Sequence, residues 1–208
     1  MSNFESQRQE LEKYGIGTFD DVPQDILKYL KKGYSKNNKT NKNLAGHIKE
    51  EYDYIDIPLK IEKYLINSAI KKPFLVDHSK SIQVLNKNAP FKLHKLWINF
   101  QKKYEFNPIH DHSGIWSFII FLQIPYNLED EDKMFPETSF TNIKSATSRL
   151  NFIFYNYIGK LENFYVNVDK SFVNKMLMFP ANLLHSVYPF YTSNKPRITV
   201  SGNIVLSI

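Results

Sequence analysis

The second half of the chain is built of short runs rich in β-branched and aromatic residues, separated by turn residues. No helical repeat lies between these runs, and this pattern favours an antiparallel sandwich or jelly roll. Run 116–124 is almost continuously apolar, which is typical of a strand buried on both faces. The expected strands cover residues 93–101, 116–124, 150–157, 163–168, 175–179, 185–190 and 197–206.

The first third of the chain shows helical spacing instead. Ile61, Leu65 and Ala69 form one apolar stripe, and Pro58 suits the first turn of that helix. Helices are expected over residues 1–14, 21–30, 44–54 and 57–70. The sequence therefore predicts a mainly β protein with N-terminal helices (α+β), in which a helical segment, residues 1–85, packs on a jelly-roll domain, residues 86–208.

Cysteine is absent from the 208 residues, which excludes disulfides and thiolate metal sites. Any metal ion must therefore be held by His, Asp or Glu, and a cytoplasmic setting is expected. The N-terminus lacks the apolar segment of a conventional signal peptide. The longest purely apolar run, residues 118–122, is far shorter than the roughly 20 residues that cross a bilayer. We expect a soluble protein that does not interact with membranes.

The chain is basic, with a formal charge of +6 and an isoelectric point near 9.2. Lysine supplies nearly all of the positive charge, and in residues 31–43 it alternates with asparagine, as in a solvated loop. A phosphate-binding face needs clustered Arg and Lys with stacking aromatic residues among them, and no such element is evident. Charge alone therefore does not favour a nucleic-acid partner, although it does not exclude one.

Two histidines, His110 and His112, lie two residues apart between Pro108 and Gly114. Side chains at i and i+2 of an extended segment point to the same face, so both imidazoles can reach one metal ion. A single histidine is usually a surface residue or a hydrogen-bonded core residue. The close pair at the end of a strand shifts this balance towards metal binding.

Asp111 lies between the two histidines and points to the opposite face of an ideal strand. His112 therefore occupies the position that a carboxylate would take in a His-x-Asp pair. A bend at Pro108 could still turn Asp111 inward. Which of the two residues would be the third ligand stays open at this point.

His185 and Arg197 come later in the chain. His185 ends an apolar run turned by Pro180, and it can complete a three-histidine site if its strand lies beside the first pair. Arg197 shares one strand face with Thr199, Ser201 and Asn203, a polar face that forms either an exposed edge or a pocket wall. In a pocket, Arg197 would bind a carboxylate through two hydrogen bonds, and the Thr199 hydroxyl would add one more.

Three segments carry a family resemblance: 107–114 (NPIHDHSG), 179–187 (FPANLLHSV) and 195–203 (KPRITVSGN). In this order they resemble the 2-oxoglutarate and Fe(II)-dependent oxygenase superfamily. They are similar in particular to a group of small members, some encoded by tailed phages, that carry His-x-His where relatives carry His-x-Asp. The resemblance covers roughly residues 93–208.

The resemblance implies a cupin-like double-stranded β-helix core and an Fe(II)- and 2-oxoglutarate-dependent dioxygenase that hydroxylates an unidentified substrate and releases succinate and CO2. It implies that His110, His112 and His185 bind the metal, while Arg197 binds the distal carboxylate of 2-oxoglutarate, with Thr199 and Asn99 nearby. The implied partners are O2 and an unknown substrate, in the cytoplasm, with a homodimer as an open possibility. If the protein is phage-encoded, that cytoplasm is the host's.

Two other classes fit parts of the pattern. A three-histidine cupin-type metalloenzyme would keep the metal and assign Arg197 to its own substrate. A non-catalytic jelly-roll module would make the histidines structural. The primary substrate cannot be inferred from the strands, because selectivity resides in loops such as residues 127–148 and in the N-terminal segment.

Overall fold

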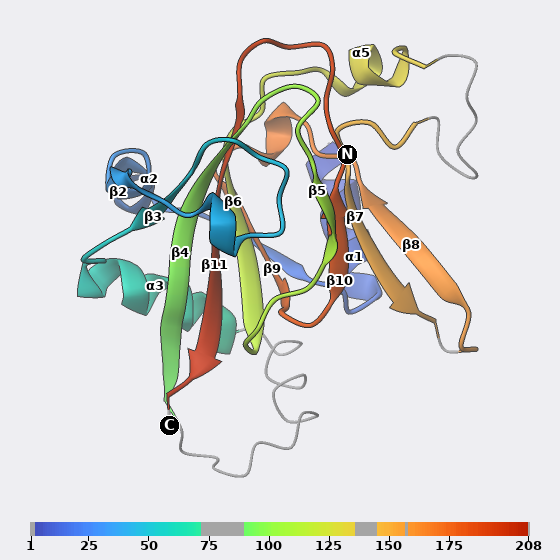
Figure 1. The fold of residues 1–208 in the computed structure, drawn as a ribbon. Coiled ribbons are helices and arrows are strands. Elements are labelled where there is room, and N and C mark those ends of the chain that lie inside the picture. Colours follow the sequence, from blue (N-terminus) through green and yellow to red (C-terminus); the bar gives the residue numbers. More distant parts are fainter. Residues whose placement is uncertain (1–2, 72–89, 136–144, 157, 208) are drawn as a thin grey trace.

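The computed structural model of the chain describes residues 3–71, 90–135, 145–156 and 158–207. Its strands form two antiparallel sheets that lie against each other (Figure 1). The larger sheet has the order β1-β9-β6-β11-β4-β3-β2, and the smaller has the order β5-β10-β7-β8. The strands are β1 (Thr18–Asp21), β2 (Tyr34–Lys39), β3 (Glu51–Tyr54), β4 (Phe91–Gln101), β5 (Asn107–His110), β6 (Trp116–Gln123), β7 (Leu150–Tyr155), β8 (Leu161–Val166), β9 (Lys175–Pro180), β10 (Leu184–Val187) and β11 (Arg197–Leu206).

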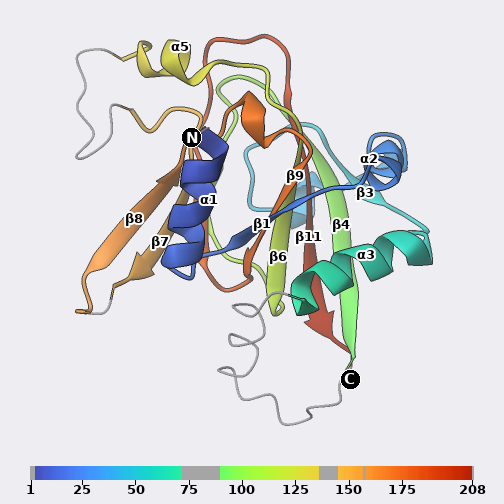
Figure 2. The ribbon, with the colours of Figure 1, turned by 180° about the vertical axis from the view of Figure 1, so that it is seen from behind.

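Helices cover the outer face of the larger sheet (Figure 2). There α2 (Gln24–Leu30) and α3 (Leu59–Ile70) bury their apolar stripes against strands β4, β6 and β11. The first helix, α1 (Asn3–Lys13), adds Phe4 and Leu11 to a second core between the two sheets. Within the described ranges, the other helical turns are α5 (Leu128–Asp132), η1 (Asn41–Asn43) and η2 (Lys170–Phe172).

Strand β6 separates the two cores. Phe118 and Ile120 pack into the cluster beneath α2 and α3, whereas Phe121 packs into the cluster between the sheets. Successive side chains leave opposite faces of a strand, so an apolar run here is buried on both sides. The prediction of a doubly buried strand is confirmed, as is that of a mainly β jelly roll.

The expectation that the N-terminal third is mainly helical is wrong in one respect, because the segment also contains three strands. Strand β1 pairs with β9, and β3 pairs with β4 and β2, so both edges of the larger sheet come from this segment. The expected helix over residues 44–54 does not form, and the last four of these residues are strand β3, where Tyr54 is buried. Pairing with distant strands overrides weak local helix preference at these positions.

Two expectations fall partly outside the described residues. The proposed division between residues 85 and 86 lies there and stays a prediction. The expected loop over residues 127–148 contains α5, and its residues 136–144 are not described. Within the part of the chain that the structure covers, no helix has the length and apolar character needed to cross a membrane.

Gly202 lies at the crowded centre of the larger sheet, on β11 between β4 and β6. A β-carbon at this position would lie 2.4 Å from Cζ of Phe118 and 2.7 Å from the backbone oxygen of Lys95. Gly202→Ala is therefore expected to lower the free energy of unfolding by about 1–3 kcal/mol, the usual cost of overpacking a core. Urea unfolding measures this loss, and an unchanged midpoint would contradict the packing described.

Candidate metal centre and its pocket

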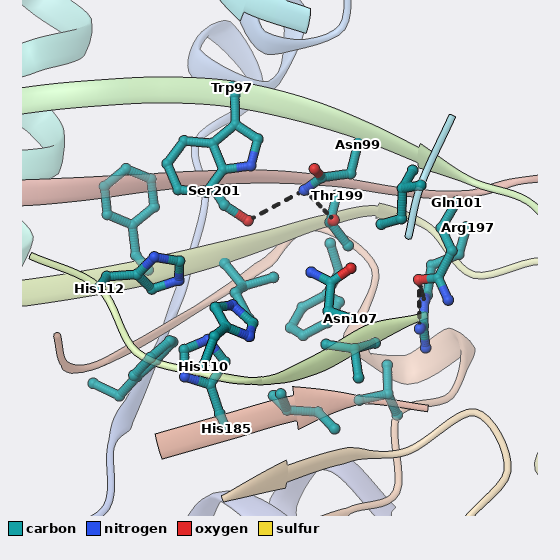
Figure 3. Close-up of a pocket in the computed structure, with 18 residues that line it drawn as sticks. Trp97, Asn99, Gln101, Asn107, His110, His112, His185, Arg197, Thr199 and Ser201 are labelled. Carbon is teal, nitrogen blue, oxygen red and sulfur yellow. Dashed lines mark hydrogen bonds between the residues drawn. The ribbon is translucent and has the colours of Figure 1, made fainter. Parts of the chain in front are cut away.

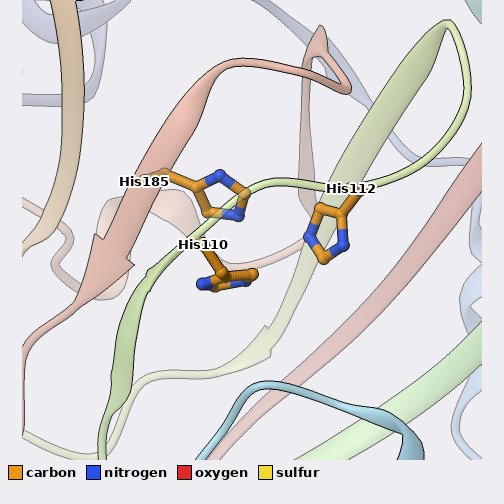
Figure 4. Close-up of side chains that lie close together, drawn as sticks. All are labelled: His110, His112 and His185. Atoms are coloured by element: carbon orange, nitrogen blue, oxygen red, sulfur yellow. The ribbon is translucent and has the colours of Figure 1, made fainter.

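Three imidazoles lie together where the smaller sheet opens towards the larger one (Figure 4). His110 ends β5 and is the cross-strand partner of His185 on β10, and His112 follows two residues after His110. The ring centroids of His110 and His185 are 4.3 Å apart, and His112 lies 4.9 Å and 5.0 Å from these two rings. One ring nitrogen from each residue lies within 4.8 Å of the others. This spacing is compatible with one shared metal ion.

Backbone carbonyls orient two of the three rings. Nδ1 of His110 lies 2.7 Å from the carbonyl oxygen of Pro108, and Nδ1 of His185 lies 2.8 Å from that of Leu183. A carbonyl oxygen only accepts hydrogen bonds, so each Nδ1 carries the proton and each Nε2 keeps its lone pair. Nε2 is therefore the nitrogen that can bind a metal, with the ring held in place from behind.

Burial keeps the three imidazoles neutral. Burial, together with the neighbouring His110 and His112, lowers the pKa of His185 to about 3. The same two causes lower the pKa of His112 to about 4, and burial lowers that of His110 as well. Neutral imidazole is the form that binds metal ions, so the cluster is ready to do so at neutral pH.

Asp111 does not join this cluster. Its side chain is exposed, whereas His112 is partly buried beside Trp97, with ring centroids 5.8 Å apart. The backbone N–H of His112 donates to the carbonyl oxygen of Ala181, which ties the segment after β5 to the turn before β10. Among the described residues, the group that could hold a metal ion contains the three histidines and no carboxylate.

A pocket extends from the histidines between the two sheets (Figure 3). On its wall, Asn99 donates from Nδ2 to the hydroxyls of Thr199 (3.2 Å) and Ser201 (3.4 Å) on β11. These residues meet because Asn99 and Thr199 are cross-strand partners on β4 and β11. The Oδ1 atoms of Asn99 and Asn107 are buried without a hydrogen-bond partner in the structure. The pocket wall therefore offers free polar atoms to a ligand.

Arg197 lies at the far end of the same pocket and is 3% exposed, which rules out the exposed-edge alternative. Its guanidinium donates five hydrogen bonds. Nε and Nη2 both donate to Oε1 of Gln101, at 3.0 Å and 2.6 Å. Nη1 donates to the Tyr126 hydroxyl and the Ser148 carbonyl, and Nη2 also donates to the Tyr188 carbonyl.

The three histidines, Arg197, Thr199 and Asn99, which the sequence indicates as site residues, all line this pocket. Gln101 and Tyr126 were not predicted from the sequence, and both contact the guanidinium. A signal for Gln101 existed, because it continues the alternating face of β4 that carries Asn99 and is the cross-strand partner of Arg197. Tyr126 follows the end of β6, and no periodic pattern points to it.

Glu51 lies next to this wall as the cross-strand partner of Asn99 on β3 and is 1% exposed. Burial, together with the charge of Glu105, raises the pKa of its carboxyl from 4.5 to about 7, and Lys95 acts in the opposite direction. The folded protein therefore binds this proton more tightly than the unfolded chain does. The resulting stabilisation is fully present below pH 4.5 and is lost as the pH rises to 7.

Glu51→Gln removes this titration. Relative to the variant, the unmodified protein is expected to lose at most about 3 kcal/mol of unfolding free energy between pH 4.5 and pH 8. Urea unfolding of both proteins at the two pH values measures the difference. If the unfolding free energies of the two proteins depend equally on pH, the raised pKa of Glu51 is contradicted.

Residues 95–203, just over half of the chain, match the protein family described as "Putative 2OG-Fe(II) oxygenase". A comparison with curated protein sequences gives no significant match. The matched family segment contains all three clustered histidines and Arg197.

Comparison with solved structures gives one match that shows the fold. A prolyl-4-hydroxylase from Pseudomonas putida aligns with a TM-score of 0.50 and 10% identity, covering 98% of each chain. A 2OG-Fe(II) oxygenase family oxidoreductase from Burkholderia pseudomallei aligns with a TM-score of 0.49 and 11% identity, covering 97% of this chain and 89% of that one. At this identity the first likeness shows the fold alone. The family match shows more, and this chain belongs to the 2-oxoglutarate- and Fe(II)-dependent oxygenases, enzymes that use Fe(II) with 2-oxoglutarate as co-substrate.

Proposed function

We propose that this enzyme hydroxylates a C–H bond of an unidentified substrate and that His110, His112 and His185 hold its Fe(II). One atom of O2 enters the product hydroxyl, and the other enters succinate as 2-oxoglutarate loses CO2. The observation that carries the proposal is the shape of the site. Three neutral imidazoles meet at one end of a pocket, and a buried guanidinium lies at the other end.

The donor set fits a divalent metal ion. Three imidazole nitrogens are suitable ligands for iron and leave coordination positions for other groups. Because all three ligands are neutral, the charge of the ion is not compensated by the protein, and this favours an anionic co-substrate. When bound, Fe(II) supplies the activation of O2 and the oxidation chemistry, and the protein supplies positioning.

The remaining residues bind and orient the co-substrate. Arg197 receives the distal carboxylate of 2-oxoglutarate, the Thr199 hydroxyl adds one hydrogen bond, and the Asn99 amide lies next to Thr199. Phe121 and Phe179 line the pocket and keep water from it. These roles use donors on the polar wall of the pocket and need no rearrangement of the sheet.

The test is turnover of 2-oxoglutarate by purified protein reconstituted with Fe(II) and ascorbate under air. Succinate, followed by NMR, is expected to form in proportion to 2-oxoglutarate consumed, and none is expected with Zn(II) in place of Fe(II). Failure to bind 2-oxoglutarate at millimolar concentration would refute the proposal. Once turnover is established, incubation of the enzyme with a cell extract would identify the primary substrate as the component that gains the mass of one oxygen atom.

A further inference from the structure

The Nε and Nη2 edge of the Arg197 guanidinium, its fork, already has a hydrogen-bond partner in this structure. Its Nε and Nη2 both donate to one oxygen, Oε1 of Gln101. Two parallel N–H donors along one edge of a guanidinium are the arrangement that binds a carboxylate. Gln101 therefore fills the seat that the proposed function assigns to the distal carboxylate of 2-oxoglutarate.

The other acceptors of Arg197 belong to the fixed part of the site. Two of them are the backbone carbonyls of Ser148 and Tyr188. The third is the hydroxyl of Tyr126, which is 2% exposed and itself donates to the Ser148 carbonyl. Release of these groups would need movement of the backbone at Ser148 and Tyr188 or of the buried ring of Tyr126. Gln101, although itself 3% exposed, contacts Arg197 through an unbranched and flexible side chain.

Gln101 is held at its other end by a turn. Its Nε2 donates to the carbonyl oxygen of Glu105, in the exposed turn that follows β4. Release of the side chain from Arg197 therefore costs the contacts with the guanidinium and one bond to a surface turn. No strand pairing is lost in the process.

Charge favours the exchange. Arg197 is buried, and among the described residues it has no ion-pair partner, because each of its acceptors is neutral. Hydrogen bonds between a guanidinium and a carboxylate are stronger than those with a neutral amide. A carboxylate that reaches this seat can therefore displace the amide oxygen.

We propose that Gln101 is a place-holder for the distal carboxylate of 2-oxoglutarate, and that it tunes co-substrate affinity by competing for the fork of Arg197. This inference rests on the proposed function. Gln101 stabilises the guanidinium before the co-substrate binds, and it withdraws when the carboxylate arrives. The residue type at position 101 then decides how well the site distinguishes 2-oxo acids that have a second carboxylate from those that lack one.

Two substitutions of Gln101 are expected to change the affinity for 2-oxoglutarate in opposite directions. Gln101→Ala empties the seat and is expected to bind 2-oxoglutarate about tenfold more tightly than the unmodified protein. Gln101→Glu places a permanent carboxylate against Arg197 and is expected to bind it at least about tenfold more weakly. The affinity for 2-oxobutyrate, which has the same chelating end and no distal carboxylate, is expected to stay unchanged in both.

The measurement is anaerobic calorimetric titration of the Fe(II)-loaded proteins with each 2-oxo acid, together with the rise in melting temperature that 2-oxoglutarate produces. That rise is expected to be largest for Gln101→Ala and smallest for Gln101→Glu. If Gln101→Ala binds 2-oxoglutarate no better than the unmodified protein, the place-holder is refuted while the proposed function stands. If the unmodified protein itself does not bind 2-oxoglutarate, the proposed function fails, and the inference with it.

Discussion

His185→Ala is expected to abolish stoichiometric iron binding and, with it, all turnover of 2-oxoglutarate. His185 is the most buried of the three histidines, and its ring lies between 4 and 5 Å from both others. Without it, two imidazoles remain on one segment of chain with no ligand from the neighbouring strand. We expect the affinity for Fe(II) to fall by more than about 100-fold, because loss of groups that merely orient a ligand already costs 10–100-fold.

The matched control is His94→Ala, because His94 is an exposed histidine on β4 that is not part of the cluster. Iron content after anaerobic loading and desalting, measured by elemental analysis, distinguishes the two variants. The control should retain one iron per chain. A His185→Ala protein that also retains one iron per chain would contradict the assignment of this ligand.

Arg197→Met is expected to weaken 2-oxoglutarate binding by on the order of 100-fold, the range found when one partner of a buried charge pair is removed. Arg197→Lys keeps the charge but loses the planar fork, so about a tenfold loss is expected for it. The effect of both substitutions is confined to the carboxylate site, because Arg197 lies at the opposite end of the pocket from the histidines. Iron binding should therefore survive both substitutions.

Anaerobic titration with 2-oxoglutarate measures the loss, and the same titration with 2-oxobutyrate is the internal control. Arg197→Met also leaves the buried Oε1 of Gln101 without the two guanidinium donors, so a lower melting temperature is expected in addition. Equal weakening towards both 2-oxo acids would point to general damage of the site. Unchanged 2-oxoglutarate affinity would show that Arg197 does not bind the distal carboxylate.

Much of the site follows from short-range patterns in the sequence. His110 and His112 fall on one face because side chains alternate along an extended segment, and the same rule groups Arg197 with Thr199. The strand containing His185 could be predicted, but its register could not. The pairing of His185 with His110 depends on how the chain folds back over 75 residues, which no local pattern encodes.

The elements that sequence reasoning missed depend on distant partners. Strand β3 exists because it pairs with β4, and its own four residues carry no strong strand signal. Gln101 was not predicted for a different reason. Its place on the face of β4 that carries Asn99 was a weak signal, and its contact with the guanidinium appears only in the structure.

The most direct test is a crystal structure of the protein grown anaerobically with Mn(II), an inert substitute for Fe(II), and 2-oxoglutarate. We predict one metal ion bound by Nε2 of His110, His112 and His185, with the distal carboxylate of 2-oxoglutarate on Arg197. A metal ion bound by the Asp111 carboxylate in place of His112, or a 2-oxoglutarate molecule away from Arg197, would contradict the account.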